Sequence, residues 1–485
     1  MQWHAAASPE VPAIVDNNGA VITFAGLYSL TLRHAACLSR LGLGPGDRVG
    51  LVLQDHSGHL ILMLAAAALG LPTLSINWAG KIEEKRAVID AFKVRLVFHD
   101  SGVRVPPGVT AVPLDDRWRG EVEHAQPREP IAMDRRVPIK VMLTSGTTGT
   151  PKGVEMTHES VIVMCQAFQQ SLNWSTPLRH LVASPFAFAG TYNFCMPLLL
   201  SGHTIELFSS VFSPEELVEA VRQRNITSLV IVPTVLRRLF RVAVDDGPLF
   251  PDMRCLVSTG GQLGADEKLM ARQQLSPFFF ESYGASGCGP ISMLQPEDMD
   301  RAADSVGRAV PLRELQVVDG SGQPLPANDV GIIRVRGPGA ALGFCDGAAS
   351  LSGDTFKDGW YYPGELGRLD HEGFLRLAGR SSDVIVRGGV NIYPSEIEDT
   401  LRRHPTVIDA AVVGVASPEF GEEIVAFFCA AGETPAQELQ ELCKRYLAPY
   451  KTPIDFVRVE TLPKSPAGKV LKSELQRNYQ SKRVI

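Results

Sequence analysis

Residues 143–153 read Leu-Thr-Ser-Gly-Thr-Thr-Gly-Thr-Pro-Lys-Gly and stand at the end of an apolar run that starts at Ile139. These eleven residues include three glycines, five hydroxyl side chains and one lysine, which is more glycine than a simple turn requires. Free backbone N–H groups in such a loop can form a concave anion site, to which hydroxyls add donors and a lysine adds charge. The stretch therefore predicts a polyphosphate site that follows a strand. The alternative is a flexible surface loop, and the spacing of a P-loop is absent.

The composition excludes several classes of protein. The chain has 485 residues, a formal net charge of −6 and 21% charged residues, so it is long enough for two or more domains and has no polybasic surface for nucleic acid or anionic lipid. Its eight cysteines lie far apart with no C-x-x-C pair, which favours reduced thiols and a cytoplasmic location. The stretch Met1-Gln-Trp-His-Ala lacks a basic region followed by an apolar stretch, so we expect no secretory signal here. The longest apolar run, residues 60–71, is too short for a membrane span of ~20 residues and predicts a buried helix.

Strand-like and helical patterns alternate through most of the chain. They lie at residues 47–53 (strand), 58–69 (helix), 95–98 (strand), 213–224 (helix) and 227–233 (strand). This alternation predicts a layered α/β architecture with largely parallel sheets.

The pattern changes in two places towards the end of the chain. Short strands and turns begin at about Gly331, and a smaller unit with a strand at 410–415 and a helix at 436–446 follows Arg380. We therefore predict two domains, residues 1–380 and 381–485. The charged stretch 115–136 reads as an exposed connection that leads into the strand before the glycine loop.

Five segments, in this order, together resemble the adenylate-forming superfamily of acyl-CoA synthetases, peptide-synthetase adenylation domains and luciferases. The segments are residues 144–153, Tyr-Gly-Ala-Ser at 283–286, Gly-Trp-Tyr-Tyr-Pro-Gly-Glu-Leu-Gly at 359–367, the stretch from Gly379 to Glu398, and Leu-Pro-Lys-Ser-Pro-Ala-Gly-Lys-Val at 462–470. The resemblance covers nearly the whole chain and is greatest to acyl- or aryl-CoA synthetases. It implies a large N-terminal domain of layered sheets and helices, and a small α+β C-terminal domain that rotates about a hinge.

The resemblance also implies a two-step reaction that uses ATP, Mg²⁺ and CoA, or the phosphopantetheine of a carrier protein. A carboxylate attacks the α-phosphate of ATP to give an acyl-adenylate and pyrophosphate, and a thiol then converts the adenylate to a thioester and AMP. Positioning and charge stabilisation are the main demands of such phosphoryl chemistry. Lys469 matches the catalytic lysine of the family, and the alternative is a solvated tail lysine beside Lys464 and Lys472.

The resemblance assigns nucleotide-binding residues by their place in the motifs. They are Thr144, Ser145, Gly146, Thr147, Thr148 and Lys152 for the phosphates, Gly260, Gly261, Gln262, Tyr283, Gly284 and Ser286 for the base side, Glu365 and Arg380 for the ribose, and Lys469. Glu365 stands where the family has a shorter acid, and its carboxylate can still accept two hydroxyl donors.

Two further departures from the family pattern concern the metal and the hinge. Gly287 stands where the family commonly has a glutamate that helps to hold Mg²⁺, so ATP oxygens, waters and loop hydroxyls must supply the ligands, and we assign no protein ligand. Ser382, followed by Asp383, stands at the hinge position that is usually an aspartate or a lysine.

The thiol path and the acyl pocket follow from the same resemblance. Arg387, Gly388 and Gly389 are expected to approach the pantetheine arm in a second pose of the C-terminal domain, and they also suit a simple hairpin turn. Phe186, Ala187, Tyr192 and Ala285 are assigned to an apolar acyl pocket, although such residues are more often plain core. The segment lacks the aspartate that holds an α-ammonium, which favours an aliphatic or aromatic acid without a free α-amine.

Three functions remain open at this point. The first is an acyl- or aryl-CoA synthetase whose partners are a small carboxylic acid, ATP and CoA. The second is an adenylating enzyme that loads an acyl carrier protein, and the third is a nucleotide-binding homologue with impaired catalysis. The absence of a dense basic cluster for docking a carrier favours CoA.

Overall fold

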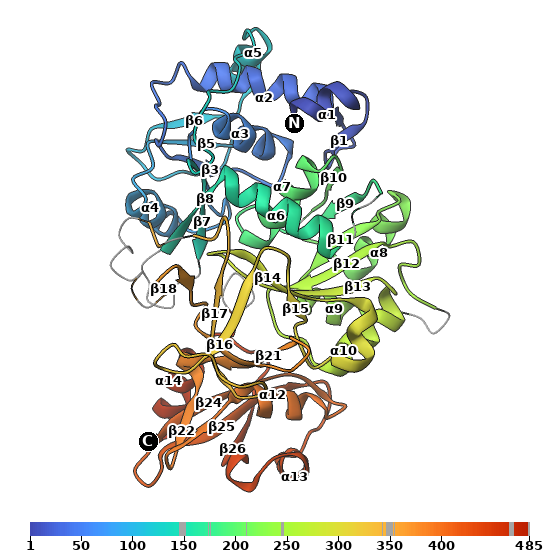
Figure 1. The fold of residues 1–485 in the computed structure, drawn as a ribbon, viewed down its shortest axis with the longest axis vertical. Coiled ribbons are helices and arrows are strands. Elements are labelled where there is room, and N and C mark those ends of the chain that lie inside the picture. The colour runs from blue at the N-terminus through green and yellow to red at the C-terminus, as the bar shows by residue number, and fades with distance from the viewer. Residues whose placement is uncertain are drawn as a thin grey trace.

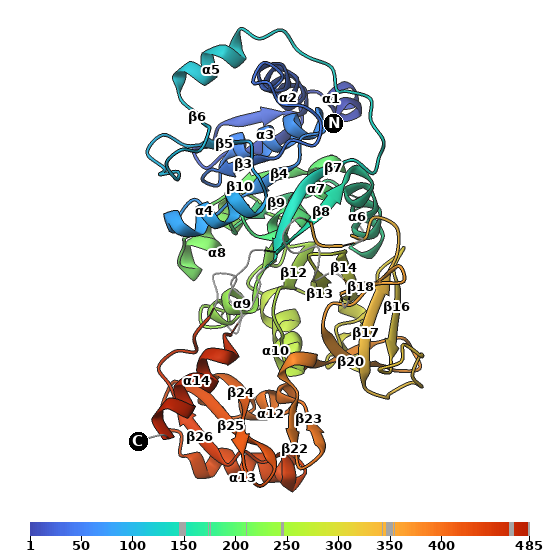
Figure 2. The same cartoon turned by 90° about the vertical axis from the view of Figure 1, so that its left-hand side faces the viewer.

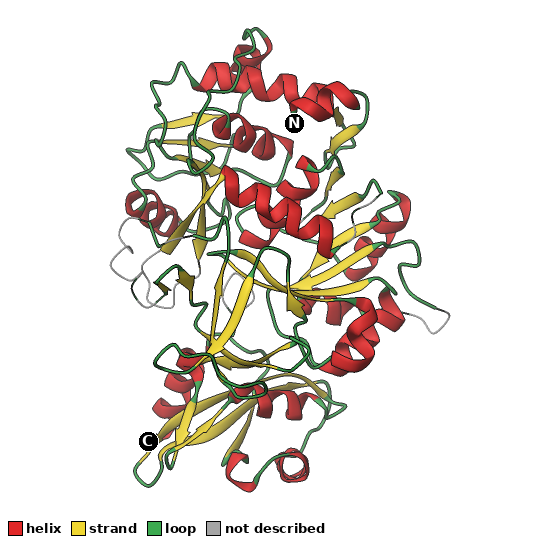
Figure 3. Ribbon diagram, in the orientation of Figure 1, coloured by secondary structure: helices red, strands yellow, loops and turns green. Residues whose placement is uncertain are grey.

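A computed structural model describes residues 1–144, 152–172, 174, 176–209, 211–243, 247–341, 343–345, 353, 355–464 and 470–483. Four residues of the predicted phosphate loop, Ser145, Gly146, Thr147 and Thr148, lie outside the described residues, and so does the predicted catalytic residue Lys469. Helices and strands are mixed along the whole chain, and Figures 1 and 3 show an upper part of sheets covered by helices above a smaller part near the C-terminus.

Two largely parallel sheets build the upper part. The nine-stranded sheet has the order β15-β14-β13-β12-β11-β9-β10-β1-β2, with parallel pairing from β13 through β1. Its strands are β1 (Pro12–Val15), β2 (Val21–Thr23), β9 (Arg179–Val182), β10 (Thr204–Leu207), β11 (Ser228–Ile231), β12 (Cys255–Thr259), β13 (Phe279–Ala285), β14 (Gly289–Leu294) and β15 (Arg308–Ala309). The predicted layered α/β architecture is confirmed.

The six-stranded sheet has the order β6-β5-β3-β4-β7-β8, in which only β8 is antiparallel to its neighbour. Its strands are β3 (Val49–Val52), β4 (Thr73–Ser75), β5 (Leu96–His99), β6 (Ala111–Pro113), β7 (Pro138–Thr144) and β8 (Lys152–Thr157). The strand predicted before the glycine loop is therefore β7, and the chain returns from the loop as β8.

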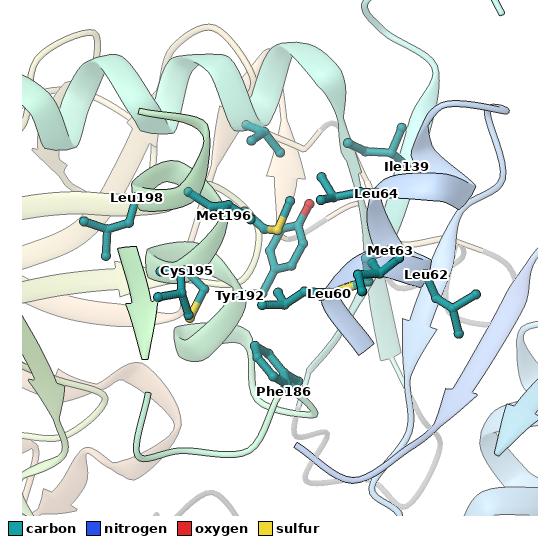
Figure 4. Close-up of a cluster of buried hydrophobic side chains, with 14 of the residues drawn as sticks. Leu60, Leu62, Met63, Leu64, Ile139, Phe186, Tyr192, Cys195, Met196 and Leu198 are labelled. Atoms are coloured by element: carbon teal, nitrogen blue, oxygen red, sulfur yellow. The ribbon is translucent and has the colours of Figure 1, made fainter. Parts of the chain in front are cut away.

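Helices cover these sheets on both faces. They are α1 (Gln2–Ala7), α2 (Phe24–Leu38), α3 (Ser57–Ala67), α4 (Ile82–Ala91), α5 (Asp116–Glu123), α6 (His158–Ser171), α7 (Ala189–Leu200), α8 (Pro214–Gln223), α9 (Pro233–Leu239), α10 (Ala265–Met270) and α11 (Met299–Ala302), with a π-helical turn at Ala271–Leu275 and a 3₁₀ turn at Pro296–Asp298. The predicted buried helix is confirmed as α3, whose residues 59–66 are all buried. In Figure 4, side chains of α3 and α7 pack against each other in the largest apolar core.

Local sequence explains why α8 starts where it does. The Ser213 hydroxyl accepts from the Glu216 N–H, the Glu216 carboxylate accepts from the Ser213 N–H, and Pro214 takes the first helical position. Leu217, Val218, Ala220 and Val221 form the buried face. The helix predicted at 213–224 is therefore confirmed.

The prediction that residues 115–136 form only an exposed connection is wrong for its first part. Helix α5 occupies Asp116–Glu123, capped by the Asp115 carboxylate, which accepts from the Trp118 N–H at 3.0 Å. Trp118 and Val122 are buried one helical turn apart, and Trp118 packs on Phe98. The many charged residues on the other faces of this short helix concealed the two-residue apolar stripe.

Two antiparallel-rich sheets complete the fold. A six-stranded sheet contains β16 (Glu314–Val318), β17 (Gly331–Arg336), β18 (Phe356–Lys357), β19 (Trp360–Tyr361), β20 (Glu365–Leu369) and β21 (Leu375–Arg380). The last sheet contains β22 (Ile385–Arg387), β23 (Val390–Ile392), β24 (Val407–Ser417), β25 (Gly421–Ala430) and β26 (Asp455–Arg458), and it is accompanied by α12 (Pro394–Arg402), α13 (Ala436–Tyr446), α14 (Lys472–Arg483) and 3₁₀ turns at Ser381–Asp383 and Pro449–Lys451.

The last sheet is covered on both faces. Residues of α12 and α13 pack on one face and residues of α14 on the other, in two separate apolar clusters. Figure 2 shows this small unit below the rest of the chain. The division at residue 380 stays a prediction; β21 ends at Arg380 and the next sheet begins at Ile385. Within the described part of the chain, no helix is both long and apolar enough to cross a membrane.

Candidate active site

The predicted phosphate loop is held at both ends by a strand pair. The last residue of β7, Thr144, is opposite the first residue of β8, Lys152, in the antiparallel register. The Lys152 ammonium lies 5.5 Å from the centre of the Phe344 ring. At Gly153 an added Cβ would lie 2.8 Å from atoms of Phe92 and Val141, so glycine is the residue that fits this packed position.

The predicted base-side residues meet at the carboxyl ends of two neighbouring parallel strands. Strand β12 ends at Thr259, which is paired with Ser282 of β13, so Gly260, Gly261 and Gln262 follow one strand next to Tyr283 on the other. Gly260 has φ +84°, a conformation that favours glycine. Ligands of parallel α/β sheets bind at such strand ends. The structure thus brings these four residues together.

The predicted ribose residues join the same group through Tyr283. Its hydroxyl donates to the Glu365 carboxylate, and Glu365 is paired with Arg380 across strands β20 and β21. Burial, followed by the nearby Glu365 charge, raises the pKa of Tyr283 well above its usual value, so the phenol stays protonated and remains a donor. Tyr283 of β13, Glu365 of β20 and Arg380 of β21 therefore lie next to one another in the fold.

At position 287, where the family commonly has an acid, an aromatic ring lies close to the glycine. Gly287 follows Ser286 after the end of β13, and an added Cβ there would lie 2.7 Å from a carbon of the Tyr361 ring. Tyr361 in turn packs on Phe356, with ring centres 5.0 Å apart. A single substitution that restores a carboxylate at 287 must therefore displace Tyr361. Gly284 is equally restricted, because a Cβ would lie 2.6 Å from the Gly289 carbonyl oxygen.

The predicted hinge starts beside the ribose cluster. The backbone N–H and the hydroxyl of Ser381 both donate to the Gly364 carbonyl, each at 3.0 Å, and the Ser382 hydroxyl donates to Asp383. Glu365 directly follows Gly364 in the sequence. The link between the two parts of the chain is therefore attached to the backbone next to the predicted ribose acid.

The predicted thiol-path residues form a tight hairpin turn. Arg387 ends β22 and Val390 starts β23, and Gly388 and Gly389 between them have φ +58° and +82°, as the favoured two-residue turn requires. The Arg387 guanidinium pairs with Glu423 and lies 4.4 Å from the Phe420 ring centre. These contacts are all within the small unit. In Figure 2 the β22 end of that unit lies farther from the upper part than α14 does.

A chain of polar contacts crosses from the base-side residues to the flank of the Lys469 segment. The Gln262 amide donates to Asp399 of α12 at 3.2 Å, and Arg402 pairs with Asp399 at 2.9 Å and with Asp409 at 3.6 Å. Asp409 in turn accepts from Lys464 at 2.8 Å. Lys464 and Val470 form an isolated antiparallel β-bridge, so the two residues that flank 465–469 lie next to each other.

The pKa values of the two carboxylates of this polar chain shift in opposite directions. Burial alone would raise the pKa of Asp409, but the charges of Arg402 and Lys464 hold it below the usual value. Burial raises the pKa of Asp399, and Arg402 lowers it only in part. Asp399 is therefore the weaker anionic link, and it is the one that contacts Gln262.

The predicted acyl residues fall into two separate groups. Phe186 and Tyr192 are 1% and 3% exposed in the core between α3 and α7, and Ala187 lines a small cavity beside them. Ala285 packs instead with Tyr283 in a different apolar cluster. Within the described residues, no group of three His, Cys, Asp or Glu residues has the arrangement of a metal site.

The sequence of the chain matches one enzyme family over both of its parts. Residues 1–345 match the AMP-binding enzyme family, and residues 396–469 match the AMP-binding enzyme C-terminal domain. The chain is an AMP-binding enzyme. The predicted membership of the adenylate-forming superfamily is confirmed.

Named relatives align with this AMP-binding enzyme along nearly the whole chain. A feruloyl-CoA synthase of Amycolatopsis sp is 29% identical over 97% of the chain and 96% of the relative. A fatty acid–[acyl-carrier-protein] ligase of Streptomyces coeruleorubidus is 27% identical over 98% of the chain and 95% of the relative. The structure of o-succinylbenzoate CoA synthetase from Bacillus subtilis in complex with an acyl-adenylate intermediate superposes with a TM-score of 0.88, at 26% identity, over 98% of the chain and 97% of the other.

Sequence reasoning missed three side chains of the AMP-binding enzyme next to the predicted acyl residues. Lys140 of β7, Ser75 of β4 and His59 of α3 are all buried and hydrogen bonded in a row. A signal was available, because Lys140 is a lone charged residue within the apolar run 139–143.

The first prediction concerns Glu365. We expect Glu365→Ala to raise the KM for ATP by about 10- to 100-fold with a smaller loss of kcat, because hydrogen bonds from ribose hydroxyls to a charged group are lost. Tyr283→Phe keeps the ring and removes only the donated hydrogen bond, so a rise of less than about tenfold is expected. Steady-state kinetics at varied ATP measures both. An unchanged KM in a folded Glu365→Ala variant would remove this residue from the nucleotide site.

The second prediction concerns the contact between Gln262 and Asp399. We expect Asp399→Ala to slow adenylate formation by about tenfold, because a hydrogen bond to a charged group that holds this pose is lost. Thioester formation from supplied acyl-adenylate should change by less than about twofold. Glu396→Ala is the matched control, since Glu396 lies on the same helix and pairs with Lys451 inside the small unit. Equal slowing of both steps would contradict the assignment of this pose to adenylation.

Proposed function

We propose that this AMP-binding enzyme activates a carboxylic acid with ATP to an acyl-adenylate and pyrophosphate, and then transfers the acyl group to the thiol of CoA, with release of AMP. The observation that carries the proposal is the polar chain from Gln262 to Lys464. It joins the predicted base-side residues to the flank of the segment that contains Lys469. A lysine delivered there would meet the substrate carboxylate and the α-phosphate, where negative charge concentrates before the bond forms.

The residues around the nucleotide fit their assigned tasks. Glu365, kept near Arg380 by the strand pairing, can accept two ribose hydroxyls, and Tyr283 offers a ring face beside the glycine strip 260–261. The phosphates would be held by backbone and hydroxyl donors of the loop that follows Thr144, with Lys152 at its end. Magnesium, bound largely by ATP oxygens and water, would neutralise the phosphate charge.

The acid that the enzyme takes is expected to be aliphatic or aromatic and to lack a free α-amine. The relatives named above are described as acting on ferulate, a fatty acid and o-succinylbenzoate, which supports an acid of this class. Phe186 and Tyr192 give the predicted pocket an apolar wall. All eight cysteines are free, which supports the proposed cytoplasmic location.

The test of this function is pyrophosphate release across a panel of carboxylic acids, with CoA or a phosphopantetheine-bearing carrier protein as the thiol. Acid-dependent pyrophosphate release followed by CoA thioester formation is the expected result. The second candidate function is loading of a carrier protein, which is favoured by the carrier-dependent relative. A carrier preferred over CoA by orders of magnitude at matched low concentration would replace the first function by the second. Without any acid-dependent release, the catalytically impaired homologue becomes the better description.

The third prediction tests Lys469. We expect Lys469→Ala to reduce adenylate formation by at least about 100-fold and to leave thioester formation from supplied acyl-adenylate within about threefold of the native rate, because this lysine acts in one pose only. Single-turnover assays of the two half-reactions make the measurement. Lys472→Ala is the control, since Lys472 is a nearby lysine that pairs with Glu398 at 2.7 Å. A similar loss in the control variant would show that general positive charge, rather than Lys469, is required.

The fourth prediction tests the thiol path. Gly389 has open space around its Cβ position, so the fold leaves room for a side chain there, although its φ of +82° disfavours most residues. We expect Gly389→Trp to slow thioester formation at least about tenfold with CoA and with a carrier alike, and to spare adenylation, because the pantetheine arm is common to both thiols. Gly389→Asn, which tolerates positive φ, is the matched control. Unimpaired thioester formation in the tryptophan variant would remove the hairpin from the thiol path.

A further inference from the structure

Three lysines of the described chain are less than 4% exposed, and they differ in what they contact. Lys268 forms an ion pair with Glu281 at 2.5 Å and also donates to a backbone carbonyl. Lys85 donates to the Arg104 carbonyl at 3.0 Å. The third, Lys140, has neither a carboxylate nor a carbonyl oxygen as partner among the residues whose positions the structure describes.

The partners of Lys140 are all uncharged. Its ammonium donates to the Ser75 hydroxyl, lies 3.6 Å from the Met63 sulfur and lies 5.3 Å from the centre of the Tyr192 ring. Figure 4 shows Met63 and Tyr192 among leucine side chains of this core. An ammonium has three N–H donors, and among the residues that the structure describes only the Ser75 oxygen meets one of them. A buried cation with so few acceptors is costly unless something else pairs with it.

Ser75 is shared with a neutral histidine. The Ser75 hydroxyl lies 2.9 Å from His59 Nε2, and burial, reinforced by the Lys140 charge, lowers the pKa of His59 well below its usual value. The hydroxyl therefore accepts from Lys140 and is also hydrogen bonded to a neutral imidazole. Burial also lowers the pKa of Lys140 to about 7. An anion placed beside Lys140 would favour the charged ammonium again.

A small cavity opens beside Lys140 and is lined by Ser75 and by residues 140–143 and 186–189. Its volume of about 10 Å³ is close to that of one water-sized group, so it suits the tip of a ligand rather than a whole acyl chain. Strand β7 runs from Lys140 to Thr144, where the predicted phosphate loop begins. At ~3.3 Å per residue these positions are ~13 Å apart. The cavity thus lies along the stretch of β7 from Lys140 to Leu143, which leads to the predicted phosphate loop.

We propose that Lys140 is the specificity-determining residue of the acyl pocket, and that it pairs with a second carboxylate at the far end of a dicarboxylic acid substrate. The proposal rests on the proposed function, because the other carboxylate is the one activated by ATP. Lys140 and its hydrogen-bond partner Ser75 both line the cavity, together with Phe186 and Ala187. The strand length of ~13 Å between Lys140 and Thr144, the residue before the predicted phosphate loop, gives the scale expected for the separation of the two carboxylates.

The experiment compares matched pairs of mono- and dicarboxylic acids: hexanoic and adipic, octanoic and suberic, decanoic and sebacic. Pyrophosphate release with each acid gives kcat/KM for the native enzyme, for Lys140→Met and for Lys85→Met, a buried lysine elsewhere in the chain. We expect the native enzyme to favour a diacid. Lys140→Met should lower kcat/KM for that diacid about 100-fold and leave the paired monoacid within about threefold, while Lys85→Met keeps the native ratio.

A second readout needs no turnover. Thermal unfolding with each acid alone should show that the diacid raises the melting temperature of the native enzyme and not that of Lys140→Met, and Ser75→Ala should show an intermediate shift. A native preference for monoacids, or a diacid-to-monoacid ratio that Lys140→Met leaves unchanged, would overturn the proposal. Absence of pyrophosphate release with every acid, together with a Lys140-dependent thermal shift, would instead contradict the proposed function and leave the diacid site supported.

Discussion

The hydrogen bond between Gln262 and Asp399 joins the two parts of this enzyme at the boundary where the predicted rotation would separate them. The two predicted poses would need similar free energies if both are to be populated, since each ~1.4 kcal/mol changes their ratio about tenfold. The contacts described at this boundary are polar, and the carboxylate that Gln262 meets is the one whose pKa burial raises. A hydrogen bond to such a group contributes about 1–3 kcal/mol, which is enough to favour one pose and small enough to be broken.

The predicted hinge and the predicted nucleotide site meet at the start of strand β20. Ser381 donates twice to the Gly364 carbonyl, and Glu365 follows as the first residue of β20. Any rotation that begins at residues 381–383 therefore pulls on the backbone beside the predicted ribose acid. The Tyr283 hydroxyl, which stays protonated, donates to the Glu365 side chain from strand β13 of the nine-stranded sheet. A nucleotide bound at the predicted site would contact the same cluster, so we expect nucleotide binding and the pose of the small unit to influence each other.

Sequence patterns predicted the helices and strands that have a clear local periodicity, and they missed features that depend on contacts between distant residues. The parallel architecture, the buried helix α3 and the start of α8 follow from local periodicity and capping, which need no knowledge of distant residues. Helix α5 was missed because only Trp118 and Val122 mark its buried face. Lys140 stands out in the sequence as a charged residue inside an apolar strand. Its hydrogen bond to Ser75 of a neighbouring strand could not be predicted, because no local pattern shows which distant residues pair.

Gly287 and Tyr361 depend on each other, because the Tyr361 ring lies where a side chain at position 287 would be. The Tyr361 ring occupies the space into which any side chain at 287 would extend, so the absent carboxylate leaves no vacancy to be refilled. The ring is anchored by Phe356, and the Gly287 carbonyl accepts from the Ala341 N–H at 2.7 Å, which fixes the backbone at this point. A carboxylate at position 287 would require the Tyr361 ring to shift. This packing fits the prediction that Mg²⁺ is held by ATP oxygens, waters and loop hydroxyls rather than by a side chain at position 287.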